Sequence, residues 1–243
     1  MRPHTCFPAL QGGFPREICP AIVGDSALEP GRPGRGVCNV TIIKESFFAM
    51  GRLIEIRWHG RGGQGAKTAA LLFGDACLGA GMYIQAFPEY GPERMGAPVA
   101  SYNRISDEPI TIHSAVENPS VVVILDPTLI GSVDVTKGLR GDGVVLVNTG
   151  EPAEKMREKL KLNGQKLYVL DASAIAMETI GRNIPNTPML GALVGATEIV
   201  DFNHMIEDTE KKLQKKFRNK PEVIQGNLDA IRKAYEVVKA QKG

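Results

Sequence analysis

A glycine-rich segment between a strand-like and a helix-like stretch restricts this chain to few folds. Residues 53–58 alternate apolar and polar side chains as a strand does, and residues 66–78 repeat apolar side chains at helical spacing. Between them, Gly60, Gly62 and Gly65 match the pattern G-x-G-x-x-G in the strand–turn–helix context that the motif requires. Glycines permit a tight turn and let an anion approach the amides at the start of the helix.

Strand-like and helix-like segments continue to alternate along the chain. The apolar run 121–125 is typical of a sheet covered on both faces. Segments 99–105 and 110–113 are close enough to pair as a hairpin. We therefore expect an α/β fold, a Rossmann-like three-layer α/β/α sandwich with a mostly parallel, mixed sheet. The other expected strands are 82–87, 144–147 and 167–170, and the later helices are 152–160, 171–180, 186–200, 203–217 and 221–240.

The first 49 residues differ from the rest in composition. They hold six of the 16 prolines and three of the four cysteines, and they show no apolar period. The three cysteines, spaced 13 and 19 residues apart without a Cys-x-x-Cys pair, are too dispersed for the usual metal or cluster site; they are Cys6, Cys19 and Cys38. We expect residues 1–49 to be an irregular extension, or an upstream artefact if Met50 is the true start, and residues 50–243 to form the domain.

Charge and hydropathy argue against several classes of partner. Lys and Arg number 29 and Asp and Glu 27, a formal charge of +2, which is too balanced for nucleic-acid binding by bulk electrostatics. No apolar run reaches the roughly 18 residues that suggest a membrane helix, and no secretory apolar stretch follows the N-terminus. We expect a cytoplasmic chain that binds neither nucleic acid nor a membrane.

The glycine loop alone leaves its ligand open. A dinucleotide site also needs an acidic residue about 20 positions later, and Glu89 is near that spacing but follows Pro88 in a loop. The P-loop pattern fails by one residue, because Ala66 separates Gly65 from Lys67. A phosphate-bearing ligand is expected, and the alternative is a tight turn that binds nothing.

Five segments carry a more specific signal. They are residues 56–65, 85–98, 103–105, 114–119 and 186–192. In this order they resemble the gamma subunit of 2-oxoacid:ferredoxin oxidoreductases, and the resemblance extends from about Met50 to the C-terminus. The form Glu-Arg-Met-Gly-Ala-Pro at 93–98 is more similar to the pyruvate members than to the indolepyruvate or 2-oxoglutarate members.

The resemblance implies a role within a larger enzyme. Such enzymes convert pyruvate, or a related 2-oxoacid, and coenzyme A to acyl-CoA and CO2, with ferredoxin as electron acceptor. In the family, thiamine diphosphate is bound by the alpha and beta subunits, [4Fe-4S] clusters sit on the beta and delta subunits, and the gamma subunit helps to form the CoA site. Competing hypotheses are an NAD(P)-binding oxidoreductase and a purely structural subunit.

This chain agrees with such a division of labour. It has no Cys-x-x-Cys motif, and only Cys77, which we expect in the core, follows the first 49 residues. We therefore expect it to bind neither thiamine diphosphate nor a cluster by itself, and to work only with alpha, beta and delta subunits.

The expected CoA-binding residues are the loop and positions at the carboxyl edge of the sheet. They are Gly60, Arg61, Gly62, Gly63, Gln64, Gly65, Glu89, Tyr90, Arg94 and Asn148. We expect no catalytic residue and no metal ligand. The alternatives are a solvated Arg61, an Arg94 paired with Glu89 or Glu93 at a subunit interface, and an Asn148 in a plain turn.

A basic run at 211–220 contains six Lys or Arg residues in ten positions. It is interpreted either as a docking patch for acidic ferredoxin or a neighbouring subunit, or as a solvated helix end whose lysines suit the C-terminal dipole. We favour the second interpretation. His59, just before the glycine loop, is expected to be structural, with a role toward a ligand as the alternative.

Overall fold

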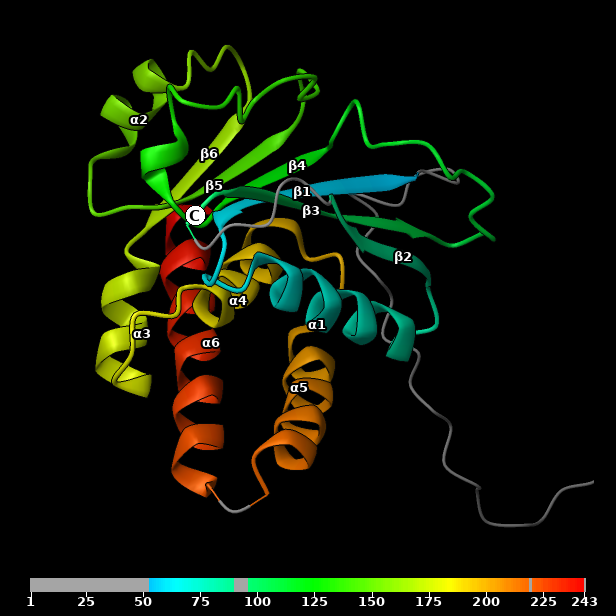
Figure 1. The fold of residues 1–243 in the computed structure, drawn as a ribbon, viewed down its shortest axis with the longest axis vertical. Helices are drawn as coiled ribbons and strands as arrows, with labels where there is room; N and C mark the ends of the chain where they lie inside the picture. The colour runs from blue at the N-terminus through cyan, green and yellow to red at the C-terminus, as the bar shows by residue number, and fades with distance from the viewer. Residues whose placement is uncertain (1–52, 90–95, 219, 243) are drawn as a thin grey trace, which may run out of the picture. The chain divides into compact units, whose positions relative to one another are not determined.

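The computed structural model describes residues 53–89, 96–218 and 220–242 (Figure 1). Within these ranges six strands form one sheet in the order β2-β3-β1-β4-β5-β6. The strands are β1 (Ile54–Arg61), β2 (Tyr83–Pro88), β3 (Pro98–Ser106), β4 (Val121–Ile124), β5 (Val144–Asn148) and β6 (Lys166–Leu170). The helices are α1 (Ala66–Gly79), the 3-10 helix η1 (Pro127–Leu129), α2 (Ala153–Lys159), α3 (Ala172–Ile180), α4 (Asn186–Thr197), α5 (Phe202–Lys216) and α6 (Pro221–Lys242). The extension predicted at residues 1–49 lies outside the described residues.

The sheet is mixed, as expected. Strands β1, β4, β5 and β6 run parallel, whereas β3 is antiparallel to both β1 and β2. Strand β3 therefore lies between β1 and β2, which follow one another in an ordinary dinucleotide-binding fold.

The predicted hairpin between 99–105 and 110–113 is wrong. Residues 110–113 form no strand, and β3 pairs with β1 and β2 instead. The Arg104 guanidinium donates hydrogen bonds to the carbonyls of Ser114 and Ala115, at 2.7 and 3.1 Å. Within the predicted strand, the carbonyls of Ile110 and Ile112 accept from the side chains of Gln85 and Arg104, each at 3.4 Å, and not from a neighbouring strand.

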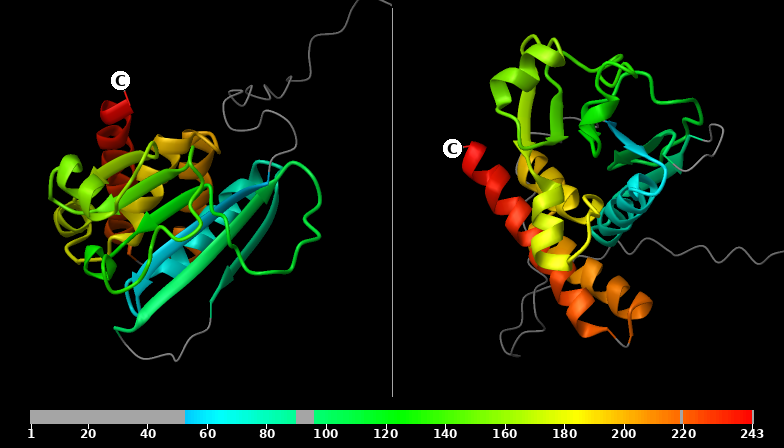
Figure 2. Two further views of the ribbon diagram at one scale, coloured as in Figure 1. Left: turned by 90° about the horizontal axis from the view of Figure 1, so that it is seen from above. Right: turned by 60° about the vertical axis from the view of Figure 1, so that its left-hand side comes forward.

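The first helical layer contains α1, α4 and α6, which pack against one face of the sheet (Figure 2). A Cβ on Gly191 would lie 2.1 Å from the Ile231 carbonyl oxygen, and one on Gly195 would also contact α6. These two glycines therefore let α4 pack closely on α6. Helix α4 ends at Thr197, earlier than predicted, because Glu198 adopts a left-handed φ of 52°.

A thinner layer covers the opposite face. It consists of α2, η1 and the loop after η1, and it completes the three-layer sandwich (Figure 2). Its apolar core is made by Val122, Ile124, Leu129, Val135, Val145, Val147, Met156 and Leu160. The carboxyl ends of β1, β4 and β5 remain between the two layers, and the glycine loop leaves the sheet at this edge.

Candidate functional site

The glycine loop begins inside strand β1. Gly60 and Arg61 are the last residues of the strand, so the turn itself is residues 62–65. The Gly62 amide donates to the Ala97 carbonyl at 2.9 Å, which continues the pairing with the chain before β3. Gly63 and Gly65 have φ values of 99° and 82°, a region that side chains with a Cβ rarely adopt.

The two left-handed glycines have different surroundings. A Cβ on Gly63 would meet no atom of the described residues within 4 Å. A Cβ on Gly65 would lie 2.6 Å from Nδ2 of Asn186, the first residue of α4. Gly65 is thus required for two helix starts to approach one another, and no described residue covers the Cβ direction of Gly63.

The start of α1 is suited to an anion. Gly65 is its N-cap, no side chain caps it, and its first turn contains no acidic residue. The first amides of a helix lack partners within the helix, and the helix dipole places partial positive charge there. An anionic group at this helix start would therefore meet backbone donors and no carboxylate from the first turn of α1.

A carboxylate that the sequence analysis missed holds the loop in place. Gln64 Nε2 donates to Asp126 Oδ2 at 2.7 Å, and Arg61 Nε lies 3.2 Å from the same oxygen. The Arg61 amide in turn donates to Gln64 Oε1 at 2.8 Å. The Thr128 amide and hydroxyl donate to Asp126 Oδ1 at 2.9 and 2.6 Å. We call these four residues the Asp126 lock.

The lock contains an ionised carboxylate. Burial raises the pKa of Asp126, but hydrogen bonds from Thr128 and Gln64 and the charge of Arg61 outweigh it, so the pKa lies below the usual range. The side chains of Arg61 and Gln64, predicted as ligand contacts, are turned into this network. The recognisable signal for Asp126 was an acidic residue directly after the buried strand 121–125, at the sheet edge where α/β folds bind ligands.

Asn148 lies at the same edge and joins three elements. Its Nδ2 donates to the Leu125 carbonyl at 2.8 Å and lies 3.0 Å from Ser173 Oγ, while Oδ1 accepts from the Ser173 amide at 3.1 Å. The residue is only 5% exposed. Its side chain ties the end of β4 and the start of α3 to β5, so the structure gives it an internal role.

Glu89 lies apart from the glycine loop. It follows β2, which β3 separates from β1, and its carboxylate accepts a hydrogen bond from the Tyr102 hydroxyl. Burial, together with Glu89, raises the pKa of Tyr102 to about 12. The position beside β1 that a ribose-binding acid occupies in a dinucleotide site is therefore not held by Glu89. Tyr90 and Arg94 lie outside the described residues.

His59 is buried on the face of β1 that turns away from α1. Desolvation, followed by the neighbouring Arg57 charge, lowers the pKa of His59 to about 4, so the ring is neutral at pH 7. Its Nε2 has no hydrogen-bond partner among the described residues. Arg57 donates to the carbonyls of Val135 and Lys137 at 3.1 and 2.6 Å, which anchors the loop that covers both side chains.

Other expected features concern metals, membranes and the core. Within the described ranges, no group of three or more His, Cys, Asp and Glu residues is placed to hold a metal ion, and no helix there is long and apolar enough to cross a membrane. Cys77 is buried in the core as predicted, and burial raises the pKa of its thiol. The other three cysteines lie outside the described residues.

Three comparisons with known proteins agree with one another. The family model described as pyruvate ferredoxin/flavodoxin oxidoreductase matches residues 55–237. Pyruvate synthase subunit PorC of Thermotoga maritima is 52% identical over 191 residues, which are 79% of this chain and 97% of the relative. The pyruvate/ketoisovalerate oxidoreductases common subunit gamma of Pyrococcus abyssi is 47% identical over 184 residues, 76% of this chain and 96% of the relative. The crystal structure of pyruvate oxidoreductase subunit PORC from Thermotoga maritima has a TM-score of 0.67 at 49% identity, covering 76% of this chain and 97% of that one.

Proposed function

Because the chain belongs to the pyruvate ferredoxin/flavodoxin oxidoreductase family, as a gamma-type subunit, we propose that its glycine loop forms part of the coenzyme A site of the assembled enzyme. That enzyme oxidatively decarboxylates pyruvate or a related 2-oxoacid, gives acyl-CoA and CO2, and reduces ferredoxin. The observation that carries the proposal is the uncapped start of α1 behind the open side of Gly63.

The chemistry of CoA fits this position. CoA carries phosphate groups, and the amides at the start of α1 are donors whose helix dipole favours negative charge. Gly63 lets a ligand approach the backbone closely, because no side chain in the part of the chain that the structure describes stands within 4 Å of its Cβ direction. Hydrogen bonds to a charged phosphate are stronger than those between neutral groups.

The Asp126 lock prepares the loop for this ligand. Gln64 and Arg61 are fixed to one carboxylate, so the intervening glycines need little reordering when an anion binds. A site that is ordered in advance loses less entropy on binding. Asp126, Arg61 and Gln64 are therefore positioning residues, and this chain supplies no proton donor or nucleophile to the reaction in our proposal.

The remaining chemistry belongs to the other chains. Thiamine diphosphate supplies carbanion stabilisation and iron–sulfur clusters supply electron transfer, and we assign both to alpha, beta and delta subunits. Within this chain we assign the family role to residues 50–243, in keeping with a family match that begins at residue 55.

The test replaces Gly63 by Val in the assembled complex. Valine penalises the φ of 99° and places a branched side chain where the phosphate should approach. Loss of two or three charge-assisted hydrogen bonds should remove roughly 2–5 kcal/mol of CoA binding free energy, at about 1.5 kcal/mol each. Cluster reduction driven by pyruvate without CoA should largely persist.

The matched control is Gly81→Val. Gly81 also has a positive φ, 86°, and no described atom within 4 Å of its Cβ direction, but it follows the far end of α1. It should match Gly63→Val in backbone strain and leave CoA affinity unchanged. An assembled Gly63→Val complex with wild-type CoA affinity would remove the CoA role, and NAD binding that depends on Gly63 would favour the dinucleotide alternative.

A further inference from the structure

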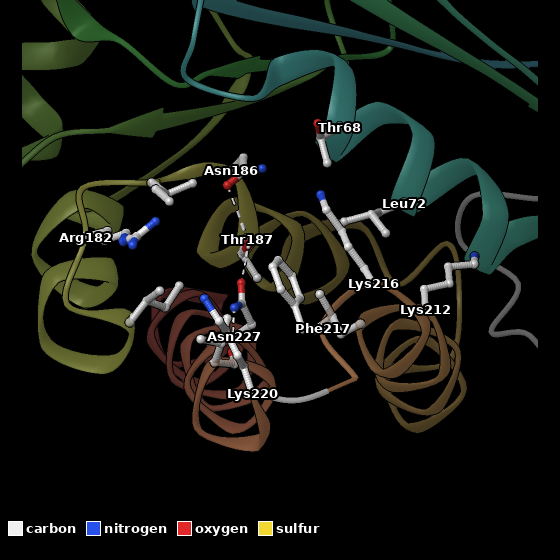
Figure 3. A pocket seen from close by; sticks show the side chains of 14 residues that line it. Thr68, Leu72, Arg182, Asn186, Thr187, Lys212, Lys216, Phe217, Lys220 and Asn227 are labelled. Carbon is white, nitrogen blue, oxygen red and sulfur yellow. Dashed lines mark hydrogen bonds between the residues drawn. The ribbon is translucent and has the colours of Figure 1, made fainter.

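A cavity of about 370 Å³ lies between α1, α5 and α6, beside the start of α4 (Figure 3). It reaches the first turn of α1 at Thr68 and the start of α4 at Asn186, the neighbour of Gly65. The proposed CoA role rests on the backbone of the loop and does not use the side chains that line this cavity. Its apolar lining comes from four helices and the segment before α4. The apolar residues are Leu72, Ile180, Ile184, Leu213, Phe217 and Val223.

Four basic side chains line the same cavity, which we call the basic pocket. Lys212 and Lys216 come from α5, Lys220 precedes α6, and Arg182 comes from the segment between α3 and α4 (Figure 3). The helix dipole accounts for lysines in the last turn of α5. It does not account for Arg182, which is distant in sequence and is brought to the pocket by the fold.

The positive charge of the pocket is only partly neutralised. Lys212 lies 2.5 Å from an Asp208 oxygen and 3.2 Å from an Asp75 oxygen. In the part of the chain that the structure describes, Arg182, Lys216 and Lys220 have no acidic partner within ion-pair distance. The surroundings of the pocket therefore favour a negatively charged partner.

Two exposed leucines of α1 lie outside the lining of the pocket, and we call them the strip. Leu71 and Leu78 are 43% and 62% exposed and stand two helical turns apart. Leu71 is one turn from Thr68 and next to Leu72, both of which line the pocket, whereas Leu78 lies near the other end of the helix. Exposed apolar side chains bordered by charges are the usual composition of a protein–protein contact.

Two polar residues in the wall of the pocket are already paired. Thr187 donates to Asn227 Oδ1 at 3.0 Å, and Asn227 Nδ2 donates to the Val223 carbonyl at 2.7 Å. Three of the four basic groups, those of Arg182, Lys216 and Lys220, lie on exposed side chains around an apolar floor. This arrangement suits an apolar anchor side chain with acidic neighbours better than a small molecule that needs several fixed polar contacts.

We propose that the basic pocket and the strip of Leu71 and Leu78 bind an acidic polypeptide segment of another chain of the complex, with an apolar side chain of that segment inserted among Leu72, Leu213 and Phe217. The proposal depends on the chain being one subunit of a larger enzyme. It does not depend on CoA binding at the glycine loop.

The first test reverses two charges with Lys216→Glu and Lys220→Glu in the co-expressed complex. Release of this subunit on dilution should increase about tenfold or more at low salt, and the difference from wild type should shrink at high salt, because salt screens exposed charges. The control Lys161→Glu and Lys166→Glu makes the same charge change at exposed positions on the α2 side of the sheet. That control should leave subunit release unchanged.

The second test addresses the apolar contact with Leu71→Ser. This exposed residue is not needed for the core, so the chain should fold, and subunit release should increase several-fold with the wild-type dependence on salt. Circular dichroism and thermal unfolding confirm that each variant is folded.

Several results would overturn the proposal. One is that the complexes with the double charge reversal and with Leu71→Ser both assemble like wild type. Another is that the control pair weakens assembly as much as the test pair. Loss of ATP or CoA binding in Lys216→Glu/Lys220→Glu with normal assembly would identify a small-molecule site instead. Gly63→Val should assemble normally, so failure of the CoA proposal and failure of this one give different results.

Discussion

The two faces of strand β1 show how one strand can serve both folding and function. Toward α1 it presents Ile54, Ile56 and Trp58, all buried in the apolar core. Toward the other layer it presents Arg57 and His59, which are equally buried but polar. The apolar face holds the strand in place in the core. The polar face continues into the Asp126 lock and orients the glycine loop at the end of the strand. The comparison shows that hydrophobic packing holds β1 and that hydrogen bonds position the glycine loop at its end.

Trp58→Ala should give the largest effect on this comparison. The change removes a fully buried indole and its hydrogen bond from Nε1 to Asn103 Oδ1 at 2.8 Å. We expect a loss of about 3–5 kcal/mol in the free energy of unfolding, as for other buried aromatic truncations. Urea unfolding of the purified chain measures this loss, and a change below about 1 kcal/mol would show that the apolar face does not support the strand.

His59 should make the polar face sensitive to acid. Its pKa is about 4 in the folded chain and near 6.5 when unfolded. Between these values the unfolded chain binds a proton that the folded chain excludes, so stability should fall as the pH drops from about 6.5 to about 4. The loss should total about 3 kcal/mol, since each pKa unit is worth about 1.4 kcal/mol.

Urea titrations at roughly pH 7 and pH 5 test this dependence in wild type and in His59→Gln. The variant should lose most of the pH dependence in this window. The control His113→Gln changes an exposed histidine and should keep it. Equal pH dependence in wild type and His59→Gln would show that the buried ring does not control acid stability.

Asp126→Asn should loosen the glycine loop without disturbing the packing of β1. The substitution removes the negative charge of the carboxylate that Arg61 and Gln64 both contact, and the chain should still fold. We expect CoA affinity of the assembled complex to fall about tenfold, corresponding to about 1.4 kcal/mol for one charge-assisted contact. Asp107→Asn, at an exposed position after β3, is the control. A tenfold loss in both variants, or in neither, would contradict a positioning role for Asp126.

Removal of residues 1–49 should have the smallest effect. The family match begins at residue 55, so a chain that starts at Met50 should retain both faces of β1, assemble and turn over as the full chain does. Activity of the two assembled complexes is compared under the same conditions. Loss of assembly on truncation would make the extension a functional arm.

The elements of the apolar core were predicted well from the sequence, because their patterns lie within short segments of the chain. Alternation at 53–58 and the helical spacing of 66–78 determine which side chains enter the core, and both elements are confirmed. The family was predicted from short motifs and is confirmed by the family match and by PorC relatives. The mixed sheet was expected as well, although for the wrong pair of strands.

The polar side was harder to predict because its contacts are distant in sequence. Asp126 lies 62 positions from Gln64, and Arg57 donates to a carbonyl 80 positions away. A basic or amide side chain beside a glycine loop indicates a ligand contact by composition alone. Only the fold reveals that Arg61 and Gln64 have a carboxylate partner. The role of the loop backbone toward CoA remains a prediction.

Amide hydrogen exchange of residues 62–68 in the assembled complex tests the central claim most directly. If the loop and the start of α1 receive CoA, saturating CoA should slow exchange at these amides, NAD should not, and the segment around Gly81 should exchange at the same rate with either ligand. Unchanged exchange at residues 62–68, in a complex that is saturated with CoA and turns over pyruvate, would contradict the assignment of the glycine loop to the CoA site.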